Sequence, residues 1–273
     1  MNLSPVRSRS WIMAVLVIVP LFILTGEPKK SSNKILIIQD ELPQLVVLTQ
    51  FLTDQGNLDV QIVDQTHQLP ELSKYRAVLI YIHKKLEVSV EKAIIDYTKK
   101  GGRLVVLHHS ISSGKAKNEF YFDFLGIHLD NPEKAKEPVD PGEGYGWVDP
   151  GTFSLVNLHS SHYISNHNVT WGERIPYTPS DSPSSVGLYP SISLDSSEVY
   201  MNHKFIDGRE KTVLCGLKFY DPRNGKLFMQ DRALWIKKQG KGEVIYFMPG
   251  HTRNDYANIQ ISQIVLNSIE WKP

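Results

Sequence analysis

The sequence has few of the features that stabilise small secreted proteins or attract nucleic acids. Its 273 residues include a single cysteine, Cys215, so no disulfide can form within the chain. Its 30 Lys and Arg residues nearly balance its 29 Asp and Glu residues, which leaves a formal net charge of +1. Nucleic-acid-binding domains usually carry a basic surplus. The composition therefore predicts no nucleic-acid partner and a domain stabilised by its hydrophobic core.

The longest hydrophobic run lies near the N-terminus. Arg7 and Arg9 precede an apolar stretch from Trp11 to Leu24, which Pro20 interrupts. A basic start followed by a short apolar run is typical of an export signal. A stable transmembrane helix needs roughly 17–25 apolar residues, more than this run supplies without the proline.

These features predict three segments. We expect residues 1–26 to be a signal peptide or an N-terminal membrane anchor, residues 27–33 a linker, and residues 34–273 one α/β domain. The domain is then exported, either periplasmic or membrane-anchored and facing outside the cytoplasm. Contact with the membrane is expected only through residues 11–25, and only if they are not cleaved.

Short apolar runs alternate with helical patterns after Lys34. The runs are typical of strands buried on both faces, and they span residues 34–38, 60–63, 77–82, 104–107 and 244–248. Apolar residues recur at helical spacing between them, as in Leu45, Leu48 and Leu52. This alternation predicts an α/β fold with a doubly wound, mostly parallel sheet.

Three segments are predicted to lie in loops. Prolines and glycines or serines crowd residues 131–151 and 177–193, which are expected to be long loop insertions. The basic segment Lys115 to Lys117 is expected to be a solvated loop face.

Polar residues follow several of the predicted strands directly. They are Asp40, His83, the run His108-His109-Ser110, and His251. Open α/β sheets bind ligands at the carboxyl ends of their strands, so these side chains should gather at one edge. Histidine suits such a site because it exchanges protons near neutral pH and its neutral form binds metals.

Several motifs resemble the ThuA-like (trehalose-utilisation) domain family. They are the run from Gly101 to Ser110, the segments His162-Tyr163-Ile164 and Glu198-Val199-Tyr200, and a closing signature of Gly240-Lys241-Gly242, a strand, Gly250-His251 and Ile269-Glu270-Trp271. The resemblance spans nearly the whole chain from Lys34. It implies a flavodoxin-like sheet related to the class I glutamine amidotransferase-like fold, and a role in carbohydrate metabolism. The chain departs from the family where His-Pro is usual, because Tyr163 follows His162, and where an acidic pair is usual, because Ser197 precedes Glu198.

The relation to amidotransferases also implies what this chain does not do. Their nucleophilic cysteine follows the strand that here ends at Leu107, but this position holds His108. Cys215 lies inside an apolar run and is expected to be a buried strand residue. Ser110 lacks the Gly-x-Ser-x-Gly turn of a serine nucleophile. Glutamine hydrolysis is therefore not expected.

The candidate site follows from the strand ends and the resemblance together. We predict His108 and His251 as general acid and base on a saccharide, with Glu198 orienting one of them or the substrate. The predicted substrate-binding residues are His109, Ser110, His162, Tyr200 and Asp40. His108, His162, His251 and Glu198 are also residue types that bind zinc, but no His-Glu-x-x-His motif is present, so no metal ligand is assigned. The sequence identifies no cofactor and no oligomeric state.

Two other functions remain open. The domain could bind saccharides without catalysis, with aromatic residues such as Tyr145, Trp147 and Trp171 stacking on sugar rings. It could also be a structural or partner-binding relic of the amidotransferase fold, in which case the sheet edge would hold no organised pocket.

Overall fold

A computed structural model describes Met1, residues 33–208 and residues 211–273. Internal contacts divide the chain into two units, Met1–Ser31 and Ser32–Pro273. The predicted export segment from Trp11 to Leu24 lies outside the described residues. Within the described ranges, no helix combines the length and the apolar character needed to cross a membrane.

Five parallel strands form one half of the main sheet. They are β1 (Lys34–Gln39), β2 (Asp59–Asp64), β3 (Ala77–Tyr81), β4 (Arg103–Leu107) and β12 (Gly242–Phe247), adjacent in the order β2-β1-β3-β4-β12. The residues of β3 and β12 are buried throughout, as expected for strands covered on both faces. The predicted α/β fold with a parallel core is confirmed.

The other half of the sheet is antiparallel. It continues from β12 through β11 (Lys226–Gln239), β10 (Lys211–Asp221), β6 (Gly146–Asn157), β8 (Gly187–Met201) and β7 (Arg174–Tyr177). A separate pair joins β5 (Ile127–His128) to β9 (Lys204–Phe205). The sheet is therefore mixed, with five of its ten strands in the parallel part, and the prediction of a mostly parallel sheet is corrected to a parallel core.

The two predicted loop insertions are wrong in part, because residues 146–151 lie in β6 and residues 187–193 in β8. The prolines that suggested loops occupy positions where a strand tolerates them. Pro150 lies within the register shift between Val148 and Gly151, and Pro190 pairs with Arg174, the first residue of the edge strand β7. A bulge or the end of a ladder spares proline the hydrogen bond that it cannot donate.

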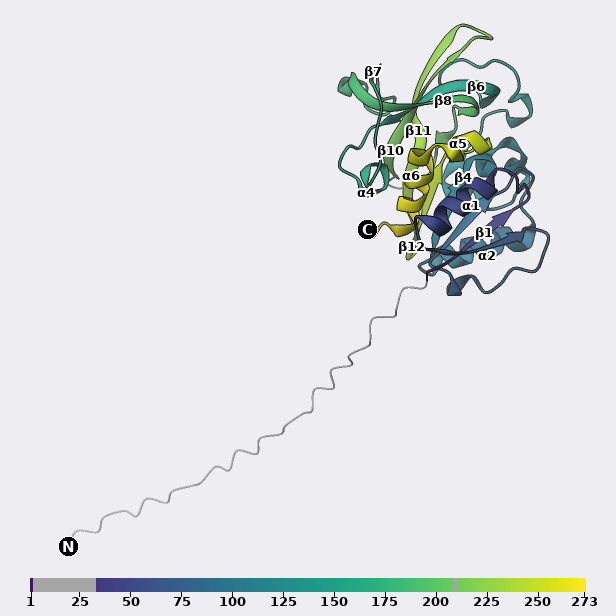
Figure 1. The fold of residues 1–273 in the computed structure, drawn as a ribbon, viewed down its shortest axis with the longest axis vertical. Helices are drawn as coiled ribbons and strands as arrows, with labels where there is room; N and C mark the ends of the chain where they lie inside the picture. The colour runs from purple at the N-terminus through teal and green to yellow at the C-terminus, as the bar shows by residue number, and fades with distance from the viewer. Residues whose placement is uncertain (2–32, 209–210) are drawn as a thin grey trace. The chain divides into compact units, whose positions relative to one another are not determined.

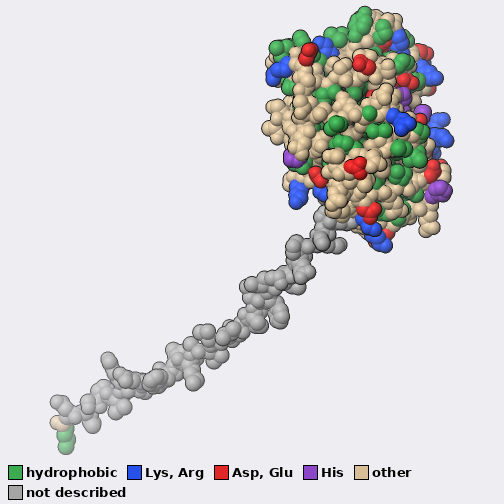
Figure 2. Space-filling view, in the orientation of Figure 1, with side chains coloured by type: hydrophobic (Ala, Val, Ile, Leu, Met, Phe, Trp, Pro, Cys, Tyr) green, Lys and Arg blue, Asp and Glu red, His purple; other side chains and the backbone are tan. Residues whose placement is uncertain are grey.

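The helices pack against the sheet and against one another. Helix α1 (Leu45–Asp54), α5 (Arg253–Ala257) and α6 (Ile259–Glu270) pack against one another, and Figure 1 shows α1 and α6 in front of the sheet. Helix α2 (Val88–Lys99) contacts α3 (Tyr121–Leu125), and α4 (Tyr163–Asn166) contacts α6. Leu45, Leu48 and Leu52 of α1 are fully buried, which confirms the helical face predicted from their spacing. Acidic and basic side chains are interspersed over the face shown in Figure 2.

The glycine turn before β12 and the C-terminal Trp271 hold the amino ends of β4 and β12 together. A Cβ atom at Gly242 would lie 2.2 Å from the carbonyl oxygen of Gly102 and 2.3 Å from that of Thr98, so only glycine fits. Arg103 pairs with Glu243. The guanidinium of Arg103 also lies 5.6 Å from the centre of the Trp271 ring. The glycine turn and the terminal tryptophan are therefore structural, at the edge opposite the strand ends where ligands are expected.

Replacement of Gly242 by alanine tests this contact. The added methyl group would collide with two backbone carbonyl oxygens, so we expect Gly242→Ala to lower the free energy of unfolding by about 1–3 kcal/mol. Gly187→Ala is the matched control, because the nearest atom to its added Cβ lies at 3.7 Å. Urea denaturation of both variants provides the comparison, and equal stability of Gly242→Ala and the natural chain would contradict the account.

Candidate functional site

The turn after β4 presents His108 in a conformation that is rare for a non-glycine residue. His108 has φ +41° and opens a short 3-10 turn, His108–Ile111. Its neighbour Ser110 holds the turn against β3, because the hydroxyl donates to the Ile80 carbonyl and accepts from the Ile82 amide. Backbone strain of this kind persists only where surrounding contacts enforce it, and it concentrates at functional sites.

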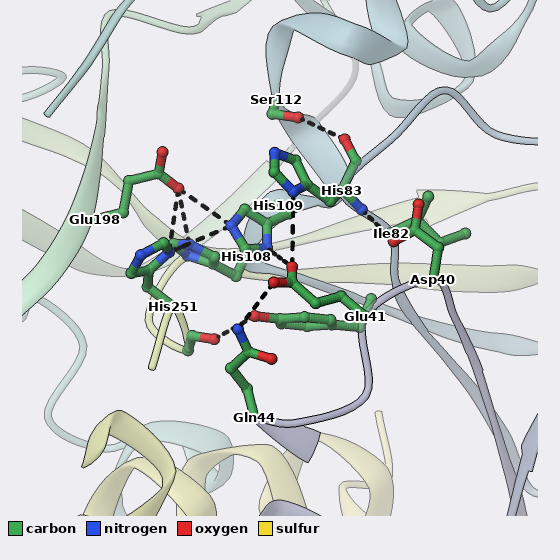
Figure 3. Close-up of polar contacts among 12 residues, drawn as sticks. Asp40, Glu41, Gln44, Ile82, His83, His108, His109, Ser112, Glu198 and His251 are labelled. Carbon is green, nitrogen blue, oxygen red and sulfur yellow. Dashed lines mark hydrogen bonds and ion pairs between the residues drawn. The ribbon is translucent and has the colours of Figure 1, made fainter. Parts of the chain in front are cut away.

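Three histidines and one glutamate meet at the carboxyl edge of the parallel strands (Figure 3). His108 and His109 follow β4, His251 follows β12, and Glu198 comes from β8 in the antiparallel half. His108 Nε2 lies 3.0 Å from Glu198 Oε2 and 3.2 Å from His251 Nδ1. His109 Nε2 lies 3.3 Å from His251 Nδ1 and 3.4 Å from Glu198 Oε2. The structure therefore brings the three predicted catalytic residues together.

Burial and mutual contact set the charges in this cluster. Burial alone raises the pKa of Glu198, but its contacts with His108, Tyr200 and His251 outweigh burial and lower that pKa below its usual value. Burial, reinforced by His108, holds the pKa of His109 far below its usual value. Glu198 is thus a carboxylate and His109 a neutral ring at neutral pH. His251, with a side chain 21% exposed, is the member of the cluster most open to solvent.

Asp255 positions the loop that carries His251. Its Oδ2 atom accepts hydrogen bonds from the backbone amides of Gly250, His251 and Thr252, at 3.2, 2.7 and 3.3 Å. The same oxygen accepts from the hydroxyl of Ser197, at 2.7 Å, which precedes Glu198 in β8. One buried carboxylate therefore fixes the backbone beside two members of the cluster.

The buried side chain of Lys115 holds two neighbouring loops through hydrogen bonds. The prediction of a solvated loop face is wrong for this residue, which is fully buried. Its Nζ donates to the carbonyl oxygens of His83 and His109, each at 2.6 Å. Burial lowers the pKa of Lys115 to about 7. Its burial is explained by these hydrogen bonds, because buried carbonyl oxygens need donors.

The predicted substrate-binding residues serve different purposes in the structure. Tyr200 is buried, and its hydroxyl donates to Glu198. Asp40 accepts hydrogen bonds from the backbone amides of His83 and Lys84 and so shapes the loop after β3. Ser110 is fully buried in its turn, and His109 belongs to the cluster. These contacts position the cluster, and a role in substrate binding for these residues stays a prediction.

His162 does not join the cluster, although we expected it there. It caps α4, where its Nδ1 accepts from the Ile164 amide, and its ring lies 5.1 Å from that of Trp271. Trp271 packs beside Arg103 at the start of β4, whereas His108 follows the end of this strand. A five-residue strand is about 16 Å long, so the motif containing His162 belongs to the other edge of the sheet.

Sequence reasoning missed four residues beside the cluster. Glu41 follows Asp40 after β1, and its Oε2 lies 3.6 Å from His109 Nδ1; Figure 3 shows His109 between Glu41 and Glu198. Asp149 lies 3.3 Å from His251 Nε2, within the stretch predicted to be a loop. Thr252 and Asp255 form a capping box, a pattern that the sequence shows directly after Gly250-His251. The strand-end argument, extended by one residue, would have found Glu41.

Comparisons with known proteins agree with this fold and these motifs. The family model described as ThuA, trehalose utilisation, matches residues 35–272. The chain belongs to the ThuA family. The ThuA resemblance predicted from its motifs is thereby confirmed.

Solved structures extend the comparison. A putative ThuA-like protein from Bacteroides uniformis is 16% identical, with 90% of this chain and 94% of that one covered and a TM-score of 0.58, which shows a shared fold. A β-galactosidase from Bacillus circulans sp. alkalophilus is 15% identical over 88% of this chain and 31% of its own, with a TM-score of 0.49. A glutamine amidotransferase from Thermotoga maritima is 9% identical over 79% and 74%, with a TM-score of 0.44. Among curated proteins, no match was found.

The cysteine of this ThuA chain is not placed to act as a nucleophile. Cys215 is fully buried in β10, and burial raises the pKa of its thiol. The position after β4 carries His108, whose buried ring faces the Met248 carbonyl with Nδ1 and the Glu198 carboxylate with Nε2. A thiolate nucleophile is therefore absent from the described part of the strand-end site.

The support that Asp255 gives to the site can be tested by mutation. Asp255→Ala leaves three backbone amides and the Ser197 hydroxyl without their shared acceptor, so we expect the free energy of unfolding to fall by about 2–4 kcal/mol. Asp195→Ala removes an exposed carboxylate from the same β8 strand and should change stability by less than about 0.5 kcal/mol. Thermal and urea denaturation of both variants measure the difference, and similar stabilities would show that Asp255 does not organise this loop.

Proposed function

We propose that this ThuA chain is a carbohydrate-active enzyme of the bacterial envelope whose reaction centre is the cluster of His108, His109, Glu198 and His251. The observation that carries the proposal is the convergence of four buried or half-buried ionisable groups at the carboxyl edge of a parallel sheet. This edge is where open α/β sheets bind ligands. Buried ionisable clusters are costly in free energy, and they concentrate at active sites.

His251 is the group in this cluster best placed to meet a substrate. Its Nδ1 faces the other cluster members, whereas its Nε2 faces the carboxylate of Asp149, which is 40% exposed. His108 is fully buried, so it acts on a substrate only through its neighbours. The acid and base roles of both histidines stay predictions, and the geometry favours His251 for direct contact.

The family description, trehalose utilisation, supports a saccharide as the substrate class. The sequence pattern of Arg7, Arg9 and the run from Trp11 to Leu24 supports export, which would expose the domain to sugars before uptake.

A catalytic role fits the structure better than saccharide binding alone. The aromatic residues that could form a stacking platform are engaged in the protein. Tyr145 is buried and stacks on Tyr200 at 6.2 Å, and the Trp171 indole donates to the Ser165 carbonyl. The ammonium group of Lys136 lies over the Trp147 ring, at 5.5 Å from its centre.

The test is turnover of saccharides by the full chain and two histidine variants. Trehalose, other disaccharides and their oxidised derivatives are incubated with each protein, and products are separated by chromatography and identified by mass spectrometry. We expect His251→Ala to lower kcat/KM by about 100-fold or more, the usual contribution of a positioned acid or base. His128→Ala, which removes an exposed histidine on β5, should stay within about threefold of the natural chain.

Two results would overturn the proposal. One is the absence of product from every saccharide while thermal shifts still reveal binding, which would support the non-catalytic alternative. The other is a His251→Ala variant that turns over its substrate at the rate of the His128→Ala control.

A further inference from the structure

The four ligand-type atoms of the cluster stand at the spacing of a metal coordination sphere. Five of the six distances among them are 3.0, 3.2, 3.3, 3.4 and 3.6 Å. A tetrahedral zinc ion bonds nitrogen and oxygen at about 2.0–2.2 Å, which separates neighbouring ligands by roughly 3.3–3.6 Å. We propose that His108 Nε2, His109 Nε2, His251 Nδ1 and Glu198 Oε2 bind one divalent transition-metal ion such as Zn²⁺.

The carbonyl group beside His108 determines which ring nitrogen carries the proton, and the other nitrogen then directs a lone pair into the cluster. The ring of His108 places Nδ1 at 2.5 Å from the carbonyl oxygen of Met248, which can only accept, so Nδ1 carries the proton. A neutral ring with its proton on Nδ1 presents a lone pair at Nε2, toward the carboxylate of Glu198 and the ring of His251. A carboxylate offers lone pairs as well. A cation between them converts this repulsion into coordination.

In each of the three histidine rings, the nitrogen that points away from the cluster faces an oxygen acceptor. Metal-binding histidines usually have such a second-layer partner on the nitrogen that does not bind the metal. His108 Nδ1 faces the Met248 carbonyl, His109 Nδ1 faces Glu41 Oε2 at 3.6 Å, and His251 Nε2 faces Asp149 Oδ1 at 3.3 Å. Such partners fix the tautomer and orient the ring toward the metal.

Two buried atoms in this second layer support the assignment independently. His109 Nδ1 and Glu41 Oε2 have no hydrogen-bond partner, although both are shielded from solvent. Their separation of 3.6 Å is slightly longer than a hydrogen bond. A small movement of the Glu41 carboxylate toward His109 would let the two atoms form a hydrogen bond, which would hold His109 Nε2 toward the ion.

The donor set indicates which ions fit. Three imidazoles and one carboxylate are typical of zinc and other late divalent ions, whereas calcium and magnesium prefer oxygen ligands alone. The open side of the site lies at His251 and Asp149, because the other three ligand residues are less than 10% exposed. A substrate oxygen would approach an ion from that side. In this arrangement the three histidines hold the ion, and this assignment replaces the acid and base roles predicted for His108 and His251.

The test measures metal binding by the full, tag-free chain without any saccharide. The protein is stripped with a chelator, dialysed and titrated with Zn²⁺ by calorimetry and with Co²⁺ by visible absorption, which reports four-coordinate geometry. We expect one ion per chain and a tetrahedral Co²⁺ spectrum. His109→Ala and His251→Ala should each abolish stoichiometric binding, whereas Glu41→Ala should weaken it by about 10–100-fold, as expected for a second-layer partner.

Matched controls separate the cluster from other histidines. His128→Ala should bind like the natural chain. If His162→Ala removes binding and His251→Ala does not, the ion belongs to the pair of His159 and His162, whose rings lie 5.5 Å apart, and the proposal is overturned. It is equally overturned if the natural chain, shown to be folded by circular dichroism, binds no stoichiometric ion. Because no sugar is present, either failure leaves the proposed saccharide chemistry to be judged by its own assay.

Discussion

The site depends on one buried carboxylate, Glu198, held among three imidazole rings. An unpaired carboxylate in that position would be strongly destabilising, so its neighbours must supply positive charge or hydrogen bonds. Tyr200 donates a hydrogen bond to it, and the proposed metal ion, held also by His108 and His109 from the end of β4, would supply the positive charge. The strained turn at His108 and the buried Lys115 beneath His109 follow from the need to bring adjacent residues of one strand end into this contact.

The mixed sheet explains how these groups come to meet. The parallel half delivers His108, His109 and His251 to one edge because its strands all end there. The antiparallel half supplies the carboxylate, since β8 lies far from β4 in the sheet order yet places Glu198 over its end. Asp255 links the two halves by bonding both the His251 loop and Ser197. At the opposite edge, Gly242 allows close packing of the backbone against Gly102 and Thr98.

Much of the parallel half could be predicted from sequence, and much of the antiparallel half could not. The sequence of β3 and that of β12 from Val244 onward are continuous apolar runs, so the positions of the residues that follow these strands are predictable. Burial along strand β8 follows no regular alternation, and its first half contains Pro190 and serines, so the sequence of that half is typical of a loop. Register shifts in β6 make Pro150 compatible with a strand, and such shifts depend on pairing across the sheet.

The same distinction applies to single residues. His108 and His251 were predictable because a strand end determines their position, whereas His162 was included through a family motif, which carries no information about which edge it occupies. The burial of Lys115 could not be predicted, because lysine is seldom buried and the two carbonyl oxygens that it bonds come together only in the folded chain.

The most direct measurement of the central claim is anomalous X-ray scattering at the zinc edge from crystals of the zinc-loaded chain. The account predicts one peak at about 2.0–2.2 Å from the facing nitrogens of His108, His109 and His251 and from an oxygen of Glu198. A cluster without anomalous density, or a peak at His159 and His162 instead, would contradict it.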